Sequence, residues 1–421
     1  MRILLIGGYG FIGRAVGEEL LRRGHDVTGW GRSATLGRRV FPEAGWIQGD
    51  LSHMRDPAAW HDALAGVDAV VNASGALQDG AGGDLQQIQG RAIVALIDAC
   101  ARAGVRKFIQ ISAPGAVADA DTRFMATKAI ADTHLRGSGL EWTILRPALV
   151  IGRNAYGGTA LIRALAVLPI QVTVHGDSIV QCVALEDVAT ACVEAVEGVT
   201  SPGEDRLLAT PERLKLREIV AIHRRWLGLA PARFAFDLSP ALAAPVGWIA
   251  DLAGWLGWRS PLRSTALRVM RHGVIADDLT GPELAPLAKI LAQHPAGVQD
   301  RVAARLFLLQ PLIVIALAAL WIGSGAVGLV ESGSAAAIIG GAQAEAIVRA
   351  CAILDLLLGA AILVRASSRP AAIAMACISA AYLLVGTILV PHLWLDPLAP
   401  LLKILPALAL SLVAAAMLDR R

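Results

Sequence analysis

Apolar and polar positions divide the chain into two parts with different patterns. Up to about residue 300, short apolar runs alternate with segments of helical spacing, and the predicted strands are RILLIGG, HDVTGW, DAVVNASG, RKFIQISA and EWTILRP. Several runs are apolar throughout, as in a parallel sheet covered on both faces. Between them, FIGRAVGEELLRRG and IQGRAIVALIDACARAG have helical spacing and end in glycine, which often stops a helix. This alternation predicts an α/β fold with a doubly wound parallel sheet.

After residue 300 the pattern changes to four long apolar segments, at about 307–330, 346–364, 371–390 and 398–418. Each is close to the roughly 20 residues that cross a hydrocarbon layer about 30 Å thick. The whole chain, 55% hydrophobic and 17% charged, is also more apolar than a soluble average. We therefore expect a four-helix transmembrane bundle over residues 301–421. A soluble helical bundle with an unusually apolar core is the alternative.

Basic residues flank these segments at alternate connections only. They are Arg301, Arg305, Arg365, Arg369, Arg420 and Arg421. The other two connections, around VESGSA and PHLWLDP, contain no lysine or arginine. Because basic flanks remain on the cytoplasmic side, we expect a multi-pass protein of the inner (cytoplasmic) membrane, with the N-terminal domain and the C-terminus in the cytoplasm.

Charge and cysteine content remove other classes of function. The formal charge of +3 and the lack of a Lys/Arg block argue against nucleic acid as a partner. The five cysteines have no pairing or metal-ligand spacing, and the nine histidines no ligand spacing, so we expect no metal site. MRILLIGGYG at the N-terminus is predicted to be a strand, because its apolar run is too short for a signal peptide and no cleavage site follows.

The segment GGYGFIG lies between the first predicted strand and the first predicted helix. Its glycines Gly7, Gly10 and Gly13 remove side chains where a pyrophosphate would approach the backbone. The helix N-terminus then offers N–H groups and a positive dipole end to the phosphates. In a βαβ unit this spacing predicts a bound dinucleotide.

The end of the second predicted strand, VTGWGRS, bears on the choice of nucleotide. NAD sites usually have an acidic residue here to bind the ribose 2′-hydroxyl, and this chain has none. Arg32 follows instead, and its guanidinium suits a 2′-phosphate. The sequence therefore favours NADP(H), with NAD(H) as the alternative and a solvated loop arginine as the simpler explanation of Arg32.

The landmarks QGDL, NASG, ISAPGA, ILRPALVIG and HGDSIVQCVALEDVA follow the glycine motif in this order. Together they resemble the atypical, extended short-chain dehydrogenase/reductase superfamily, especially its NmrA-like members and those similar to the NADPH-binding accessory subunit of complex I. The resemblance covers residues 1 to about 195. It implies a Rossmann fold and a cofactor site made of Gly7, Tyr9, Gly10, Phe11, Ile12, Gly13, Arg32, Asp50, Leu51, Ala73, Ser74, Gly75, Ser112, Lys128 and Pro147.

Enzymes of this superfamily pair a tyrosine with a lysine one helical turn later. In RFMATK the lysine is Lys128, but Phe124 occupies the tyrosine position and cannot exchange a proton. The resemblance implies that Lys128 binds the nicotinamide ribose. As other catalytic candidates we consider Ser112, Thr127 and Tyr156, the last either a proton donor or an aromatic cover of the site.

The resemblance also implies a domain layout. Residues 1–300 would form the NAD(P)-binding domain, with a small substrate lobe mainly at 152–175 and 200–300, and the four apolar segments resemble the DoxX-like membrane family. Within the membrane we expect Glu345 to pair with Arg349, and Asp355 or Glu345 to face Lys403. These groups either fix helix packing or form a polar site for a quinone or lipid head group. The Trp-rich stretch PVGWIADLAGWLGW either lies against the bilayer or is a buried helix of the lobe.

Two functions remain open. One is a membrane-anchored NADP(H)-dependent reductase of a lipophilic, quinone-like or lipid-like substrate. The other is a non-catalytic NADP(H)-binding redox sensor or assembly scaffold in a membrane respiratory or quinone-biosynthesis complex. Phe124 favours the second, and the membrane segments and glycine motif are compatible with both.

Overall fold

The structure is a computed structural model that describes residues 1–75, 84–258, 260–276, 279 and 282–419. Seven strands form one sheet, in the order β11–β6–β5–β4–β1–β2–β3, and every adjacent pair is parallel. This confirms the prediction of a doubly wound parallel sheet, and the five predicted strands are β1, β2, β4, β5 and β6. The strands are β1 (Arg2–Ile6), β2 (Asp26–Gly31), β3 (Gly45–Gln48), β4 (Ala69–Asn72), β5 (Lys107–Ile111), β6 (Glu141–Pro147) and β11 (Glu204–Leu208).

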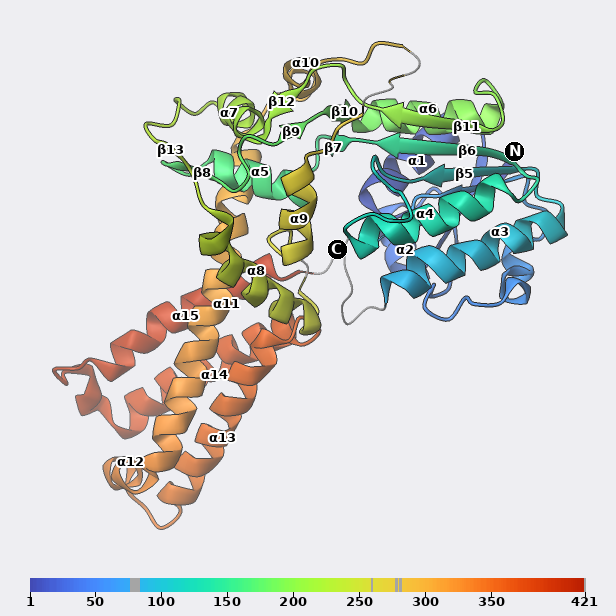
Figure 1. Ribbon diagram of the computed structural model, residues 1–421. Coiled ribbons are helices and arrows are strands. Elements are labelled where there is room, and N and C mark those ends of the chain that lie inside the picture. The colour runs from blue at the N-terminus through green and yellow to red at the C-terminus, as the bar shows by residue number, and fades with distance from the viewer. Residues whose placement is uncertain (76–83, 259, 277–278, 280–281, 420–421) are drawn as a thin grey trace. The chain divides into compact units, whose positions relative to one another are not determined.

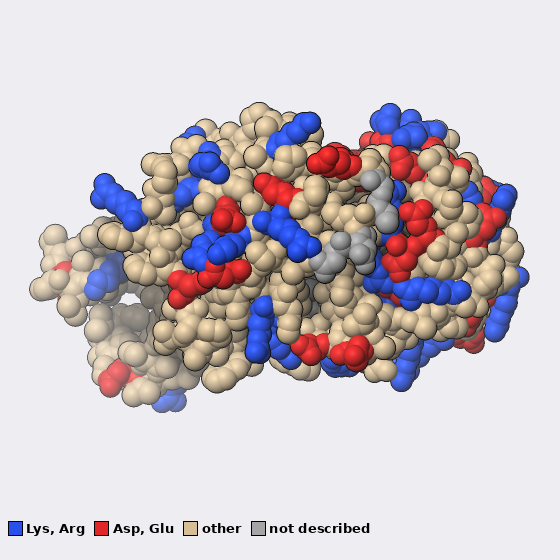
Figure 2. Space-filling view, turned by 45° about the horizontal axis from the view of Figure 1, so that its top comes forward, with Lys and Arg blue, Asp and Glu red and all other residues tan. Residues whose placement is uncertain are grey.

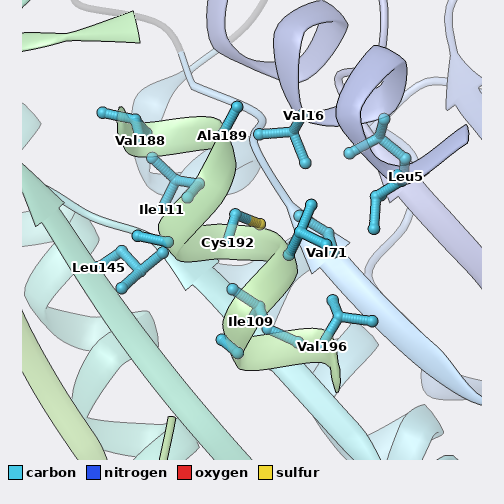
Figure 3. Packing of buried hydrophobic residues seen from close by; sticks show 14 of the residues in the cluster. Leu5, Val16, Val71, Ile109, Ile111, Leu145, Val188, Ala189, Cys192 and Val196 are labelled. Atoms are coloured by element: carbon cyan, nitrogen blue, oxygen red, sulfur yellow. The ribbon is translucent and has the colours of Figure 1, made fainter. Parts of the chain in front are cut away.

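Helices cover both faces of this sheet, so its strands are apolar on both sides (Figure 1). In β1, Ile3 and Leu5 face the core under α1 (Phe11–Arg22) and α6 (Leu185–Glu197). The alternate residues Leu4 and Ile6 face α3 (Ala92–Ala103) and α4 (Arg123–Arg136). Figure 3 shows the first of these cores, where Cys192 of α6 packs among the side chains of β4, β5 and β6. Strand periodicity thus explains both layers.

The order of the strands reverses direction next to the glycine motif. From β1 the chain passes through α1 to β2, then through α2 (Ala34–Val40) to β3. It then crosses back to β4, on the other side of β1. In open α/β sheets, ligands bind at this reversal, outside the carboxyl ends of the strands. Here those ends are Ile6 of β1 and Asn72 of β4, whose neighbours in sequence are the glycine motif and NASG.

A third apolar core lies in the part of the chain after β6. It packs α5 (Gly158–Ala166), α7 (Leu216–Trp226) and α10 (Leu287–Ala292) against four short strands. Those strands are β7 (Leu149–Ile151), β9 (Ile179–Val180), β10 (Cys182–Ala184) and β12 (Leu214–Lys215). β8 (Gln171–Thr173) pairs with β13 (Ala235–Asp237), which follows much later in the chain. β11, inside the range expected for the substrate lobe, instead completes the main sheet.

Charged side chains of both signs share the surface, as Figure 2 shows for one face. Several form ion pairs between elements. Arg23, just after α1, lies 3.0 Å from Glu197 at the end of α6, and Arg106 lies 2.7 Å from Glu141 at the start of β6. Such exposed pairs each contribute about 0–1 kcal/mol, so the two apolar layers hold the sheet together.

The chain divides into two compact units. The sheet unit is Met1–Gly254 with Arg259–Ala304, and the helical unit is Trp255–Trp258 with Arg305–Arg421. Four helices are long and apolar enough to cross a membrane, with mean hydropathies between 1.9 and 2.3. They are α11 (Val298–Val330), α13 (Ala344–Leu363), α14 (Ser368–Leu389) and α15 (Pro400–Met417). These match the four predicted segments, and α12 (Ser332–Ile339) is a short helix between the first two.

One basic flank lies beside the end of α15, and Arg420 and Arg421 fall outside the residues that the structure describes. Arg369, at the start of α14, lies 3.0 Å from Asp419 after α15, and Arg365 donates to the Leu418 carbonyl at 3.4 Å. The connection between α13 and α14 therefore lies beside the end of α15.

The polar groups of the membrane segments pair differently from one of our expectations. Glu345 and Arg349 form the expected ion pair at 2.6 Å. Asp355, however, accepts hydrogen bonds from Ser324 of α11 at 3.0 Å and from Tyr382 of α14 at 2.9 Å. Lys403 is exposed. The predicted contact with Lys403 is wrong, because two neutral hydroxyl groups already satisfy the Asp355 carboxylate.

The Trp-rich stretch forms α8 (Pro240–Trp255), which is followed by α9 (Ser264–His272). Trp248 is 68% exposed and Trp255 is 70% exposed. The alternative of a buried lobe helix is therefore wrong. Its outward face is apolar, which is unusual for a surface in contact with water.

Candidate nucleotide-binding site

The glycine motif forms a tight turn that only glycine fits at two positions. Gly7 has φ +80°, and a Cβ there would lie 3.0 Å from the Ala73 carbonyl oxygen. A Cβ on Gly13 would lie 2.2 Å from the Gly7 carbonyl oxygen, which already accepts the Gly10 N–H at 2.8 Å. The turn therefore presents bare backbone at the reversal between β1 and β4.

The helix after this turn begins at the glycine motif. Gly10 is the N-cap residue of α1, and among the described residues no side-chain hydrogen bond caps that end of the helix. Its first N–H groups and the positive end of its dipole therefore point out of the turn, which is the arrangement that binds phosphate groups. The close-packed glycines and this N-terminus together fit a dinucleotide pyrophosphate.

Tyr9 connects the glycine turn to the end of β2. Its ring stacks on Trp46, with centroids 5.4 Å apart, and lies so close to Gly31 that a Cβ there would be 2.7 Å from the ring. Its hydroxyl accepts the backbone N–H of Arg32 at 3.1 Å. Tyr9 thus fixes the backbone of Arg32, whose side chain is exposed just beyond β2.

Hydrogen bonds also shape the segments that follow β3 and β4. Asp50 accepts the Ser52 N–H at 2.9 Å, and Leu51 is buried. Asn72, buried at the end of β4, donates to Gln110 at 2.8 Å. Its carbonyl oxygen accepts both the N–H and the hydroxyl of Ser74. The turn containing Ala73, Ser74 and Gly75 is therefore held from within the sheet.

Lys128 is buried at the carboxyl ends of β4 and β5. Its Nζ donates to the Ile111 carbonyl at 2.9 Å, and a Cβ on Gly75 would lie 3.8 Å from it. The ammonium also lies 5.7 Å from the centre of the Phe124 ring, which is cation–π distance. Burial lowers the pKa of Lys128 to about 8, against a smaller opposite effect of Asp132.

Ser112 belongs to a buried ionic network. Its hydroxyl donates to Asp132 at 2.5 Å, and Arg146 lies 2.9 Å from the same carboxylate oxygen. Arg146 also lies 2.6 Å from Asp205 of β11. The other Asp132 oxygen is buried and has no hydrogen-bond partner among the residues that the structure describes. This network holds the end of β5 against α4 and β6.

Asp132 and the ionic role of Arg146 were not predicted from the sequence. Asp132 lies four residues after Lys128, so helical spacing places both on one face of α4. That spacing could have indicated Asp132 from the sequence. The ion pair between Arg146 and Asp205 could not have been predicted in this way, because 59 residues separate the two.

The remaining candidates lie at different places. Pro147 is buried at the end of β6. Thr127 donates to the Arg123 carbonyl of its own helix at 2.7 Å, so its proton is used locally. Tyr156 is 54% exposed, and its ring stacks on Phe11 of the glycine motif, with centroids 6.0 Å apart and planes 11° apart. The structure thus brings Tyr156 to the glycine motif from a loop about 145 residues away in sequence.

Comparisons with known proteins agree with this geometry. Residues 7–198 match the model of an NAD(P)H-binding family, and residues 318–412 match the model of the DoxX-like family. The chain therefore combines an NAD(P)H-binding, Rossmann-type reductase-like domain with a C-terminal DoxX-like domain. Its four apolar helices agree with a bilayer environment for the second domain.

Several curated proteins are similar to this chain, and three of them are as follows. The chain is 29% identical over 252 residues to a 2-alkyl-3-oxoalkanoate reductase of Stenotrophomonas maltophilia, covering 52% of this chain and 74% of that protein. It is 26% identical to an NAD(P)H azoreductase of Xenophilus azovorans, covering 58% and 80%. It is 28% identical to the photosystem II assembly factor Ycf39 of Synechocystis, covering 35% and 44%.

Proposed function

We propose that the protein is a membrane-anchored, NADP(H)-dependent reductase of a lipophilic carbonyl or quinone-type substrate. The observation that carries this proposal is the position of Lys128: a buried ammonium at the ends of β4 and β5, next to Gly75 and beside the strand reversal. A buried cation is costly unless it has a partner, and the contacts of Lys128 with a carbonyl oxygen and an aromatic ring only partly compensate for its burial.

The cofactor residues would have the roles that the sequence suggested. The turn around Gly7, Gly10 and Gly13 would hold the pyrophosphate, and Lys128 would hydrogen-bond to the nicotinamide ribose. Arg32, with its backbone fixed by Tyr9, would bind the 2′-phosphate and so prefer NADP(H). Bound NADPH would supply a hydride to the substrate carbon.

The reduced oxygen also needs a proton, and Phe124 cannot give one. We assign that task to the Lys128 ammonium, because a pKa of about 8 suits an acid that works near neutral pH. Water would then return the proton to Nζ. Ser112 is a less suitable donor, because its hydroxyl proton already lies on the hydrogen bond to Asp132.

The relatives and the helices support the substrate class. Two of the three relatives are named as reductases, and one of them acts on 2-alkyl-3-oxoalkanoates, which are carbonyl compounds. Alkyl chains partition into bilayers, and the four apolar helices would keep the domain where such substrates are concentrated.

A non-catalytic function is the second candidate, and Phe124 favours it. An assembly factor is among the relatives, so a nucleotide-binding domain of this kind can serve a membrane complex. In that case NADP(H) would act as a bound redox signal or as structural support in a respiratory or quinone-biosynthesis assembly.

NADPH oxidation by the purified full chain in lipid nanodiscs separates the two functions. The substrates are a long-chain 2-alkyl-3-oxo acid and a short-chain quinone. For a reductase we expect turnover that Lys128→Met abolishes and that falls above pH 8, as the ammonium deprotonates. Tight NADPH binding without turnover of either substrate would refute the reductase. If Phe124→Tyr then created turnover, the missing phenol alone would separate this chain from an enzyme.

We also propose that the protein lies in the inner membrane with both termini in the cytoplasm. The alternating arginines support this topology, as does the ion pair that joins the start of α14 to the residues after α15. Labelling of an added C-terminal cysteine in intact cells by a membrane-impermeant maleimide would contradict it.

A further inference from the structure

Helix α8 has its small residues facing the protein and its large apolar residues facing outward. Its buried residues are Ala243, Gly247, Ala250 and Gly254, at spacings of four, three and four. They form one narrow stripe, and Gly247 lies against Ser264 and Leu267 of α9. The outward residues are 47–70% exposed, namely Leu242, Val246, Trp248, Ile249, Leu252 and Trp255.

This is the reverse of a helix on the surface of a soluble domain, which turns its large apolar side chains inward. Small residues at a helix–helix contact and large apolar residues outside are typical of helices in contact with lipid. The stretch 240–258 contains a single charged residue, Asp251. Its carboxylate lies 3.1 Å from Arg263 and accepts the Ser264 N–H, on the side where α9 follows.

The end of α8 continues directly into the helical unit. Trp255–Trp258 belong to that unit. Trp258 donates to the carbonyl of Leu363, the last residue of α13, at 2.6 Å, and its ring lies 5.4 Å from the Arg365 guanidinium. The Leu256 carbonyl accepts the Arg365 N–H at 2.9 Å. The chain after α8 is thus fixed at the end of two membrane-spanning helices, where the basic flank lies.

We propose that α8 lies in the plane of the bilayer, with this apolar face among the lipid acyl chains on the side of the basic flanks. Its 16 residues extend about 24 Å, too short to span a layer of about 30 Å, and Pro245 interrupts it. Tryptophan favours the membrane boundary, and the exposed Arg268 and Arg271 of α9 suit lipid phosphates. Lipid is the partner that fits this face, because Trp255–Trp258 at the end of α8 already belong to the helical unit.

Spin-label accessibility on the full chain in lipid nanodiscs tests this. Trp248→Cys is labelled in a background in which Cys351 and Cys377 are alanine. Val199→Cys, at a position 72% exposed in the sheet unit, is the matched control. We expect the label at 248 to be reached by oxygen, and by a water-soluble nickel chelate about fivefold less than the label at 199, because hydrocarbon excludes polar solutes.

Two results would overturn the proposal. Equal access of the nickel chelate to both labels would place α8 in water. Exclusion of both oxygen and nickel at 248 would mean that a protein, either a partner or a second copy of the chain, covers the face. Leu252→Cys repeats the measurement one turn later, so the result does not depend on a single label or on one variant.

Discussion

The Gly13→Ala variant tests the nucleotide-binding turn directly. The added methyl carbon would lie 2.2 Å from the Gly7 carbonyl oxygen and 2.9 Å from its carbonyl carbon. Ordinary contacts are about 3.5 Å, so the overlap is more than about 1 Å and the backbone has to move. Both atoms belong to the backbone, and the oxygen already holds Gly10, so no side-chain rotation relieves the clash.

Overpacking of this kind costs about 1–3 kcal/mol. If the turn moves and the fold remains, that energy appears as about a 5- to 150-fold loss of NADPH affinity. The assay is a fluorescence titration with NADPH, and thermal unfolding without nucleotide shows whether the fold is kept. The control is Gly137→Ala, where the added carbon meets nothing closer than 3.7 Å and should change neither value. A folded Gly13→Ala protein with normal NADPH affinity would show that the nucleotide does not bind at this turn.

Three other predictions follow from single side chains. Arg32→Ser should lower NADPH affinity about tenfold and leave NADH affinity unchanged in parallel titrations, and an equal loss for both would exclude a 2′-phosphate contact. Burial lowers the pKa of His223 to about 4, so below about pH 6.5 the unfolded chain binds a proton that the folded chain does not. The contribution of His223 to stability should therefore be complete above that pH and fall by about 3 kcal/mol toward pH 4. In denaturant titrations, His223→Asn should reduce this dependence of stability on pH. Asp355→Leu should leave the hydroxyls of Ser324 and Tyr382 without their acceptor and destabilise the helical unit by about 1–3 kcal/mol. Asp355→Asn keeps an acceptor and should destabilise it less. Equal melting temperatures for wild type and Asp355→Leu in detergent would contradict this prediction.

The candidate nucleotide-binding site could be proposed from the sequence, because its residues lie on local segments. The glycine turn, the turn after β4 and Lys128 each lie directly beside a strand end or on a helix, and strand order brings them together. The network behind them was not predictable in the same way. Arg146 meets Asp132 and Asp205 only because β6 lies next to β5 on one side and β11 on the other.

The contacts of Tyr156 and Lys403 also could not be decided from the sequence. From its loop, Tyr156 could be interpreted as a proton donor or as an aromatic cover, and the stacking on Phe11 places it at the glycine motif without deciding between them. Lys403 was a reasonable partner for Asp355 by depth in the membrane. Depth alone, however, does not tell which face of α15 turns inward.

The sequence by itself determined the sheet, the glycine turn and the four apolar helices, because strand and helix periodicity and apolar length are local properties of the chain. Only the tertiary structure decided which polar groups share a partner and which apolar face stays uncovered, as with Asp355 and the outward side of α8. Those outcomes depend on distant segments packing together, and a hydrogen bond or a buried stripe exists only once that packing has formed.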